Sequence, residues 1–243
     1  MFEFEIEEND IERIPLGIGT LDEKISGGIP SGHIVLVCGS AGSMKSSITY
    51  SILFNLAKNY GRKVVYITLE QSKESILKHM KGLGFDNTNS EQVRKNLAIV
   101  DLGHLRKEIK DIENVDWMKS LIDQIKKYKM TYGFDVVAID SMEALYVLAE
   151  MKNPRNQLFT FFENLRDLDL TSFLITEMKR GTMEIGTYGI EDFLADGVIH
   201  LDVRKDDDTV NRYVGVIKMR ATKHDMDYYP LLIEDGGFEI VTR

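Results

Sequence analysis

Several features common in other protein classes are scarce or missing in this 243-residue chain. It has one cysteine, Cys38, so an internal disulfide is excluded, and its position in an apolar run is typical of a core residue rather than a reactive thiol or ligand. No apolar run approaches the ~20 residues that cross a bilayer. The first ten residues, MFEFEIEEND, lack the basic and apolar regions of a secretory signal. We therefore expect a cytoplasmic protein without membrane insertion.

Basic residues are also in deficit. The chain has 30 Lys and Arg against 39 Asp and Glu, a formal net charge of -9. Nonspecific nucleic-acid binding depends on neutralising phosphates with Lys and Arg, so this balance argues against it, although a local basic patch stays open. We find no internal repeat, low-complexity segment or clear linker. With 43% hydrophobic and 28% charged residues, the composition predicts a single domain over residues 1–243.

The order of apolar segments predicts an α/β fold. Apolar and β-branched runs predict strands at 34–38, 63–69, 97–100, 134–139 and 171–176. Helical spacing predicts a short helix near 20–25 and longer ones at 45–59, at 72–81 with Gly82 as its stop, after Trp117, and at 157–168. This alternation implies a mostly parallel sheet flanked by helices. Strand pairs around residues 205–208 and 234–237 predict that antiparallel hairpins finish the fold.

A glycine-containing loop directly follows the first strong strand. Residues 39–46 read GSAGSMKS and match the pattern G-x-x-x-x-G-K-[ST] except at one position. In such a loop backbone N–H groups bind phosphate oxygens, the lysine reaches the β- and γ-phosphates, and the hydroxyl binds Mg²⁺. The alternative is a glycine-rich turn with a surface lysine. The residues expected to bind ATP are Gly39, Ser40, Ala41, Gly42, Ser43, Met44, Lys45, Ser46 and Ser47, with Ser46 also a metal ligand.

Met44 stands where the pattern has its second glycine. A side chain must then fit beside tightly folded backbone. We expect Met44 to adopt a negative φ and to point toward the core, while Gly42 and Ser43 supply the remaining flexibility.

Two carboxylates follow later strands and suit a hydrolytic site. Asp140 follows the run Val136–Ile139 and is expected to bind Mg²⁺, with helix capping as the alternative. Glu70 ends the strand after the first crossover and is the candidate general base for the water that attacks the γ-phosphate. Gln71 could hydrogen-bond to the same water. The alternative for Glu70 is a carboxylate that only stabilises a helix N-terminus. Lys45 and Glu70 are thus the expected catalytic residues. Thr176 and Glu177 suit either nucleotide sensing or simple strand-end solvation.

Segments outside the phosphate loop resemble the KaiC domain family of the RecA superfamily. They are Arg13–Asp22 with Gly27–Gly32, Tyr188–Ile199, and Lys218–His224, which is similar to a K-x-R-G-T-x-H segment with Ala221 in place of glycine. The resemblance covers nearly all of the chain and implies a RecA-like P-loop core. It also implies that Lys218, Arg220 and His224 contact the nucleotide of a neighbouring subunit. From the residues alone, Lys218 and Arg220 would be a solvated strand face.

The resemblance implies an ATPase that converts Mg-ATP to ADP between subunits of a ring. We expect six subunits. The nucleotide state is expected to be coupled to ring assembly or to a protein partner. Such sites commonly have two consecutive glutamates where this chain has Glu70 and Gln71, so we expect slow hydrolysis. The phosphorylation segment of clock proteins has no match. An ATP-binding regulatory scaffold with little turnover, similar to the accessory component of the archaeal motility motor, is the first alternative. A recombinase-like DNA-binding ATPase, with residues 179–189 facing DNA, ranks last.

Overall fold

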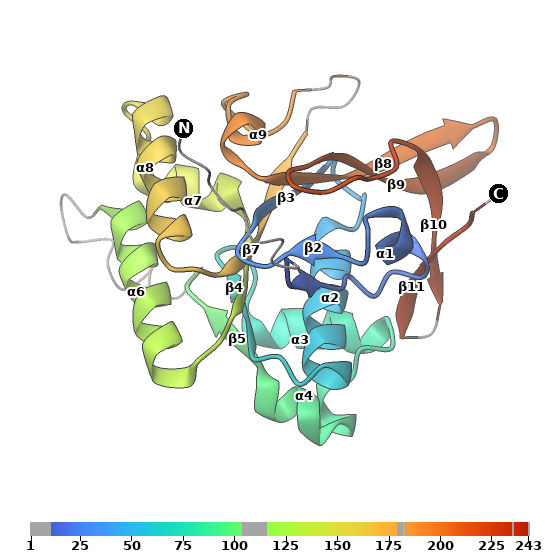
Figure 1. The fold of residues 1–243 in the computed structure, drawn as a ribbon, viewed down its shortest axis with the longest axis horizontal. Helices are drawn as coiled ribbons and strands as arrows, with labels where there is room; N and C mark the ends of the chain where they lie inside the picture. The colour runs from blue at the N-terminus through green and yellow to red at the C-terminus, as the bar shows by residue number, and fades with distance from the viewer. Residues whose placement is uncertain (1–10, 104–115, 179–181, 183, 235, 243) are drawn as a thin grey trace, which may run out of the picture.

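The computed structural model describes residues 11–103, 116–178, 182, 184–234 and 236–242. Across these ranges a nine-stranded sheet lies between two layers of helices (Figure 1). Its strands in spatial order are β11 (Gly237–Ile240), β10 (Tyr228–Glu234), β9 (Thr209–Met219), β8 (Gly197–Asp206), β3 (Ile34–Gly39), β7 (Thr171–Glu177), β6 (Val136–Asp140), β4 (Val64–Thr68) and β5 (Leu97–Asp101). The strands from β8 to β5 run parallel, while β9, β10 and β11 continue the sheet in antiparallel pairs.

Two helical layers bury the two faces of the sheet. One layer packs with the N-terminal segment and contains α1 (Leu21–Lys24), α2 (Lys45–Asn59), α3 (Lys73–Gly82), the 3₁₀ turn η1 (Asn87–Asn89) and α4 (Glu91–Asn96). The other contains α6 (Trp117–Tyr132), α7 (Met142–Ala149), α8 (Pro154–Arg166) and the short α9 (Glu191–Leu194). All six residues of β3 are buried because helices cover both of its faces, which explains its continuous apolar sequence. No helix in the described ranges has the length and apolarity needed to span a bilayer.

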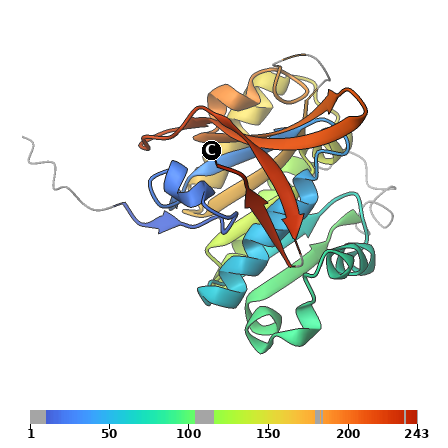
Figure 2. The same cartoon turned by 90° about the vertical axis from the view of Figure 1, so that its right-hand side faces the viewer.

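The C-terminal strands form the edge of the sheet that faces the viewer in Figure 2. Here β8 and β9 form a long hairpin, and β10 pairs with both β9 and β11. A separate two-stranded sheet joins β1 (Arg13–Ile14) to β2 (Ile29–Pro30). The predicted fold class, a mostly parallel sheet finished by antiparallel hairpins, is therefore confirmed.

Two predicted helix boundaries were wrong. Gly82 does not stop α3 but is its last residue, and Gly84, with φ +87°, follows in the turn. The helix expected from residue 157 begins at Pro154, where Asn153 accepts a hydrogen bond from the Asn156 N–H at 3.4 Å. Proline fits the first helical position because the missing N–H has no intrahelical partner there.

The direction of the parallel strands divides the sheet into two ends. We call the end where β3, β7, β6, β4 and β5 finish the carboxyl edge, and the opposite end the amino edge. In open α/β sheets, ligands bind outside the carboxyl ends of the strands. Gly39, Asp140 and Thr68 finish their strands at this edge.

Candidate functional site

The phosphate loop connects β3 to α2 at the carboxyl edge. Lys45 is half-buried, and its Nζ donates to the carbonyl oxygens of Gly39 at 2.9 Å and Ser40 at 3.3 Å. The lysine is therefore folded over the loop and is not a free surface side chain. A Cβ on Gly39 would lie 2.3 Å from the Leu201 carbonyl oxygen, so a larger residue does not fit there. The buried Ser43 hydroxyl has no hydrogen-bond partner in the described part of the chain.

Met44 adopts a left-handed conformation, with φ +73° and ψ +30°, immediately before α2. The prediction of a negative φ was wrong. The turn into α2 requires left-handed backbone at this position, which explains why the motif normally has glycine there. The expected direction of the side chain is confirmed, because Met44 packs against the hydrophobic cluster beneath α2.

Asp140 lies beside the start of α2, although β7 separates its strand β6 from β3. The Tyr66 hydroxyl and the Ser46 hydroxyl both hydrogen-bond to its carboxylate. Burial raises the pKa of Asp140, while these hydrogen bonds and the Lys45 charge act in the opposite direction. The alternative role as a helix cap fails, since Ser141 is the N-cap residue of α7.

Glu70 projects from the carboxyl edge next to Asp140. The Ser141 hydroxyl donates a hydrogen bond to Glu70 Oε1, and the negative charge of Glu70 contributes to the raised pKa of Asp140. Glu70 does not sit at a helix N-terminus, because the cap of α3 is Ser72. Its carboxylate is exposed and held by one hydroxyl, a geometry that suits a general base.

Gln71 makes its hydrogen bonds to Ser75 of α3 and to Thr68 at the end of β4. Its Oε1 accepts from the Ser75 hydroxyl on α3 at 3.4 Å, and its backbone N–H donates to the Thr68 hydroxyl at 3.1 Å. The side chain thus contacts α3 through Oε1, and its expected binding of the water beside Glu70 remains a prediction.

A second buried carboxylate, Glu143, links α7 to the end of β7. Glu143 Oε1 accepts from the Thr176 hydroxyl at 2.7 Å and from the Glu177 N–H at 2.8 Å. Its Oε2 is buried and has no partner among the described residues, and burial raises its pKa. Thr176 is thus held by Glu143, and Glu177 is exposed, so their proposed sensing role remains a prediction.

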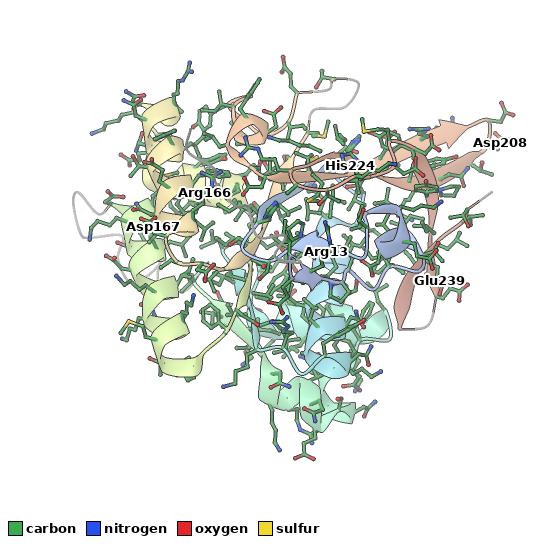
Figure 3. The ribbon with its side chains drawn as sticks, viewed as in Figure 1. Arg13, Arg166, Asp167, Asp208, His224 and Glu239 are labelled. Carbon is green, nitrogen blue, oxygen red and sulfur yellow. The ribbon has the colours of Figure 1, made fainter. Side chains whose placement is uncertain are left out.

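Lys218 and Arg220 lie at the amino edge, away from the phosphate loop of their own chain. Strand register pairs Gly39 with Leu201 at the carboxyl edge, whereas Val35 pairs with Gly197, and Gly197 pairs with Met219. The four residue steps from Val35 to Gly39 span about 13 Å of strand. In Figure 3, Asp208 lies at the tip of the β8–β9 hairpin, and His224, which follows β9, lies well away from that tip.

The amino-edge cations bind groups of the α9 segment. Lys218 Nζ donates to the carbonyls of Asp192 at 2.7 Å and Ala195 at 2.8 Å, and Arg220 pairs with Asp196 at 2.8 Å. Burial, with a smaller effect from the Arg220 charge, lowers the pKa of Lys218. His224 Nδ1 contacts only the Asp225 carbonyl, at 3.0 Å, among the contacts of the described residues.

Sequence reasoning missed two arginines near these segments. Arg13, labelled in Figure 3, donates to Thr222 Oγ1 at 3.1 Å and to the Ala221 carbonyl at 3.3 Å, which fixes the segment after Arg220. Arg212 on β9 donates to the Gly42 carbonyl at 3.2 Å and holds the phosphate loop from its own chain. Arg13 opens one of the segments that resemble the KaiC family and Arg212 lies in no motif, but neither contact could be predicted because each joins segments far apart in sequence.

The loop proposed to face DNA is only partly within the described residues, since 179–181 and 183 lie outside them. Its later part is fixed by Glu191, which is fully buried. The Glu191 carboxylate accepts from the N–H groups of Thr187, Tyr188 and Ile190 at 3.0–3.1 Å and from the Tyr146 hydroxyl at 3.0 Å. These contacts anchor the loop to α7.

The donor set fits Mg-ATP better than an all-protein metal site. No group of three or more His, Cys, Asp or Glu side chains gathers as a metal cage within the described ranges. Mg²⁺ with a nucleotide commonly needs only one or two protein oxygens, because phosphates and waters supply the rest. Ser46 and Asp140 offer such a pair of oxygens. The positive charge of Lys45 lies over the loop, where its Nζ binds the loop carbonyls.

Comparisons with known proteins agree on one family. Residues 14–243 match the family described as "ATPase: KaiC". A UPF0273 protein of Aeropyrum pernix is 32% identical over 237 residues, covering 93% of this chain and 92% of its own length. A UPF0273 protein of Pyrobaculum aerophilum is 31% identical over 237 residues, covering 95% and 83%.

Longer and solved relatives extend the comparison. The circadian clock protein KaiC2 of Synechocystis is 28% identical over 232 residues, which cover 94% of this chain but 40% of KaiC2. The crystal structure of a KaiC-like protein of Pyrococcus horikoshii superposes with a TM-score of 0.82 at 29% identity, covering 96% of this chain and all of that one. The resemblance predicted from the sequence motifs is confirmed.

Proposed function

The chain belongs to the KaiC family of ATPases, and on this basis we propose that it hydrolyses Mg-ATP slowly, at sites completed between subunits of a ring. The convergence of Lys45, Asp140 and Glu70 at the carboxyl edge carries the proposal. A phosphate-binding loop, a metal-binding carboxylate and a candidate base are the parts that phosphoryl transfer to water requires.

Each group has a distinct role in the proposed reaction. Lys45 would turn from the loop carbonyls toward the β- and γ-phosphates. Mg²⁺, held by Ser46 and Asp140, would neutralise charge on the phosphate oxygens. Glu70 would orient and deprotonate the attacking water, and the hydrogen bond from Ser141 would fix its carboxylate.

The proposed ring explains the position of the remaining cations. Lys218 and Arg220 are too distant to serve their own phosphate loop but lie on the surface or near it. In a head-to-tail ring the amino edge of one subunit can meet the carboxyl edge of the next. Fixed cations there would stabilise charge on the transferred phosphoryl group. We expect six subunits, located in the cytoplasm, that signal their nucleotide state to a protein partner.

A regulatory scaffold with little turnover is the second candidate. It is favoured by Gln71, since the amide is bound to Ser75 and only Glu70 is available as a base. DNA binding stays the last alternative because of the net charge of -9.

Steady-state hydrolysis of Mg-ATP, with nucleotide binding measured in parallel, tests the proposal. We expect Glu70→Gln to lower kcat by roughly 10²–10⁴ with binding retained, and Lys45→Ala to weaken binding. Glu74→Gln is the matched control, because Glu74 is a nearby exposed carboxylate in the first turn of α3. Binding without turnover in the unmodified protein would establish the scaffold, and absence of binding would refute both candidates.

A further inference from the structure

Tyr66 lies in the middle of β4 and is fully buried, and its hydroxyl reaches the candidate metal site. Strand register pairs Tyr66 with Ala138 of β6, and Thr68 with Asp140. Asp140 is therefore the diagonal neighbour of Tyr66, two residues, or about 7 Å, further along the adjacent strand. An aromatic side chain can reach a diagonal neighbour on the same face of a sheet. The Tyr66 hydroxyl makes this contact by donating a hydrogen bond to Asp140 Oδ2.

The ring of Tyr66 is held in place by helix α2. Tyr50 packs edge-on against it, with ring centroids 5.6 Å apart and an interplanar angle of 61°. Tyr50 is itself fixed, because its hydroxyl donates to Asn87 Oδ1 at 2.7 Å and its ring packs edge-on against Phe85. Tyr50 follows Ser46 by four residues, so both side chains lie on the same face of α2. One helix therefore supplies the expected metal-binding hydroxyl and the ring that fixes Tyr66.

The side chains of Ser46, Tyr66 and Asp140 form one hydrogen-bonded group. The Ser46 hydroxyl hydrogen-bonds to the Asp140 carboxylate and to the Tyr66 hydroxyl. The torsion that orients an aspartate carboxylate is only weakly restricted by the side chain itself. A donor on a buried, packed ring restricts it, so Tyr66 sets the direction in which Asp140 presents its remaining lone pairs. Tyr66 thus contacts both of the residues expected to hold Mg²⁺.

A purely structural role for the hydroxyl is the alternative, because a buried tyrosine hydroxyl needs a hydrogen-bond partner wherever it lies. Tyr50 shows what that alternative looks like in the same cluster. Its hydroxyl is bound to Asn87 of η1, away from the phosphate loop. The hydroxyl of Tyr66 is bound instead to the carboxylate that is expected to hold the metal.

We propose that Tyr66 is a positioning residue for the metal, whose hydroxyl holds Asp140 and Ser46 in the arrangement that binds Mg²⁺ beside the phosphate loop. This role rests on the proposed function, in which those two residues hold Mg²⁺. Groups that orient a metal ligand contribute about 10–100-fold to metal affinity. Phenylalanine at position 66 would lose the donor, and the gap left by one oxygen atom is too small for a water molecule to replace it.

Metal affinity at a fixed pH tests this role. In the full-length protein with bound ADP, Mn²⁺ serves as the probe, because electron paramagnetic resonance measures the free ion. Tyr66→Phe should weaken Mn²⁺ binding by about 10–100-fold, while ADP affinity in EDTA changes by less than about twofold. Tyr50→Phe is the matched control, since it removes a hydrogen-bonded hydroxyl from the same aromatic cluster but not from the site. It should leave both affinities unchanged.

Combination with Asp140→Asn shows whether Tyr66 acts through Asp140. In the Asp140→Asn background, adding Tyr66→Phe should change Mn²⁺ affinity by less than about twofold. A further loss there as large as in the unmodified background would contradict positioning through Asp140. Equal Mn²⁺ affinities in Tyr66→Phe and Tyr50→Phe would also overturn the proposal, and neither result would affect the proposed hydrolysis. If Mn²⁺ does not bind the unmodified protein with ADP, the metal site itself is refuted, and the role of Tyr66 with it.

Discussion

At the scale of single residues, Asp140 combines a proposed metal-binding role with a cost in stability. Only 6% of its surface is exposed, and burial raises its pKa above the usual 3.8. The protonated form is therefore favoured by folding. The stability that this group contributes is present below the unfolded-state pKa and is lost as the pH rises through the folded-state pKa. At neutral pH the ionised carboxylate destabilises the fold.

Asp140→Asn should thus increase the free energy of unfolding at pH 7 by about 1 kcal/mol, while Mg-dependent ATP hydrolysis is lost. The difference from the unmodified protein should shrink as the pH falls toward 3.8, where the native carboxyl becomes neutral. Urea unfolding of both proteins at pH 7 and pH 4 measures it. A variant less stable than the parent at pH 7 would show that the hydrogen bonds from Tyr66 and Ser46 outweigh burial.

Met44 carries strain that glycine would remove. A non-glycine residue in the left-handed region costs about 1–2 kcal/mol, which packing of the Met44 side chain offsets in part. Met44→Ala keeps the strain and loses the packing, so it should be less stable than Met44→Gly by about 1 kcal/mol. Urea unfolding of the two variants isolates the backbone effect. Equal stabilities would mean that the loop relaxes to a negative φ in solution.

The sequence identified the residues that belong to local patterns. Lys45, Ser46, Asp140 and Glu70 were placed correctly because a strand followed by a polar residue predicts its position at the carboxyl edge. Tyr66, Ser141 and Glu143 were not given roles, since their partners come from other strands and no spacing encodes such contacts. The φ of Met44 was predicted wrongly because the turn, not the side chain, determines it.

At the scale of elements, Glu191 fixes the loop before α9. Four donors from the loop and from α7 converge on its fully buried carboxylate. Gly186 makes room for it, as a Cβ there would lie 2.3 Å from the Glu191 carboxyl carbon. Hydrogen bonds to a charged acceptor are stronger than those between neutral groups.

Glu191→Gln replaces one acceptor oxygen with an NH₂ group and removes the charge. We expect the free energy of unfolding to fall by about 2–3 kcal/mol. Glu163→Gln on the exposed face of α8 serves as the control and should change it by less than about 0.5 kcal/mol. Thermal and urea unfolding provide the measurement, and a loss in Glu191→Gln no larger than in the control would contradict the anchoring role.

The order and type of the elements were largely predictable. Apolar runs located the parallel strands because each is buried on both faces, and turn residues located the β8–β9 and β10–β11 hairpins. The spatial order of the strands was not predictable in detail. The position of β7 between β3 and β6 depends on how the helical layers pack on the sheet, and no local sequence pattern predicts that packing.

At the scale of the molecule, the two halves of the proposed site lie at opposite edges of one sheet. Lys45 and Glu70 lie at the carboxyl edge, and Lys218 and Arg220 at the amino edge. Our proposal therefore requires two subunits for a complete site. Turnover per subunit should rise with protein concentration until assembly is complete, which hydrolysis assays across a dilution series would show.

Mixing two inactive variants tests this account most directly. Lys45→Ala disables the phosphate loop but retains Arg220, whereas Arg220→Ala retains the loop but removes the cation. In an equal mixture that assembles randomly head to tail, about one quarter of the interfaces should combine an intact loop with an intact Arg220. We predict that hydrolysis recovers to about that fraction of the unmodified rate. No recovery, although light scattering shows mixed assemblies, would contradict a site shared between subunits.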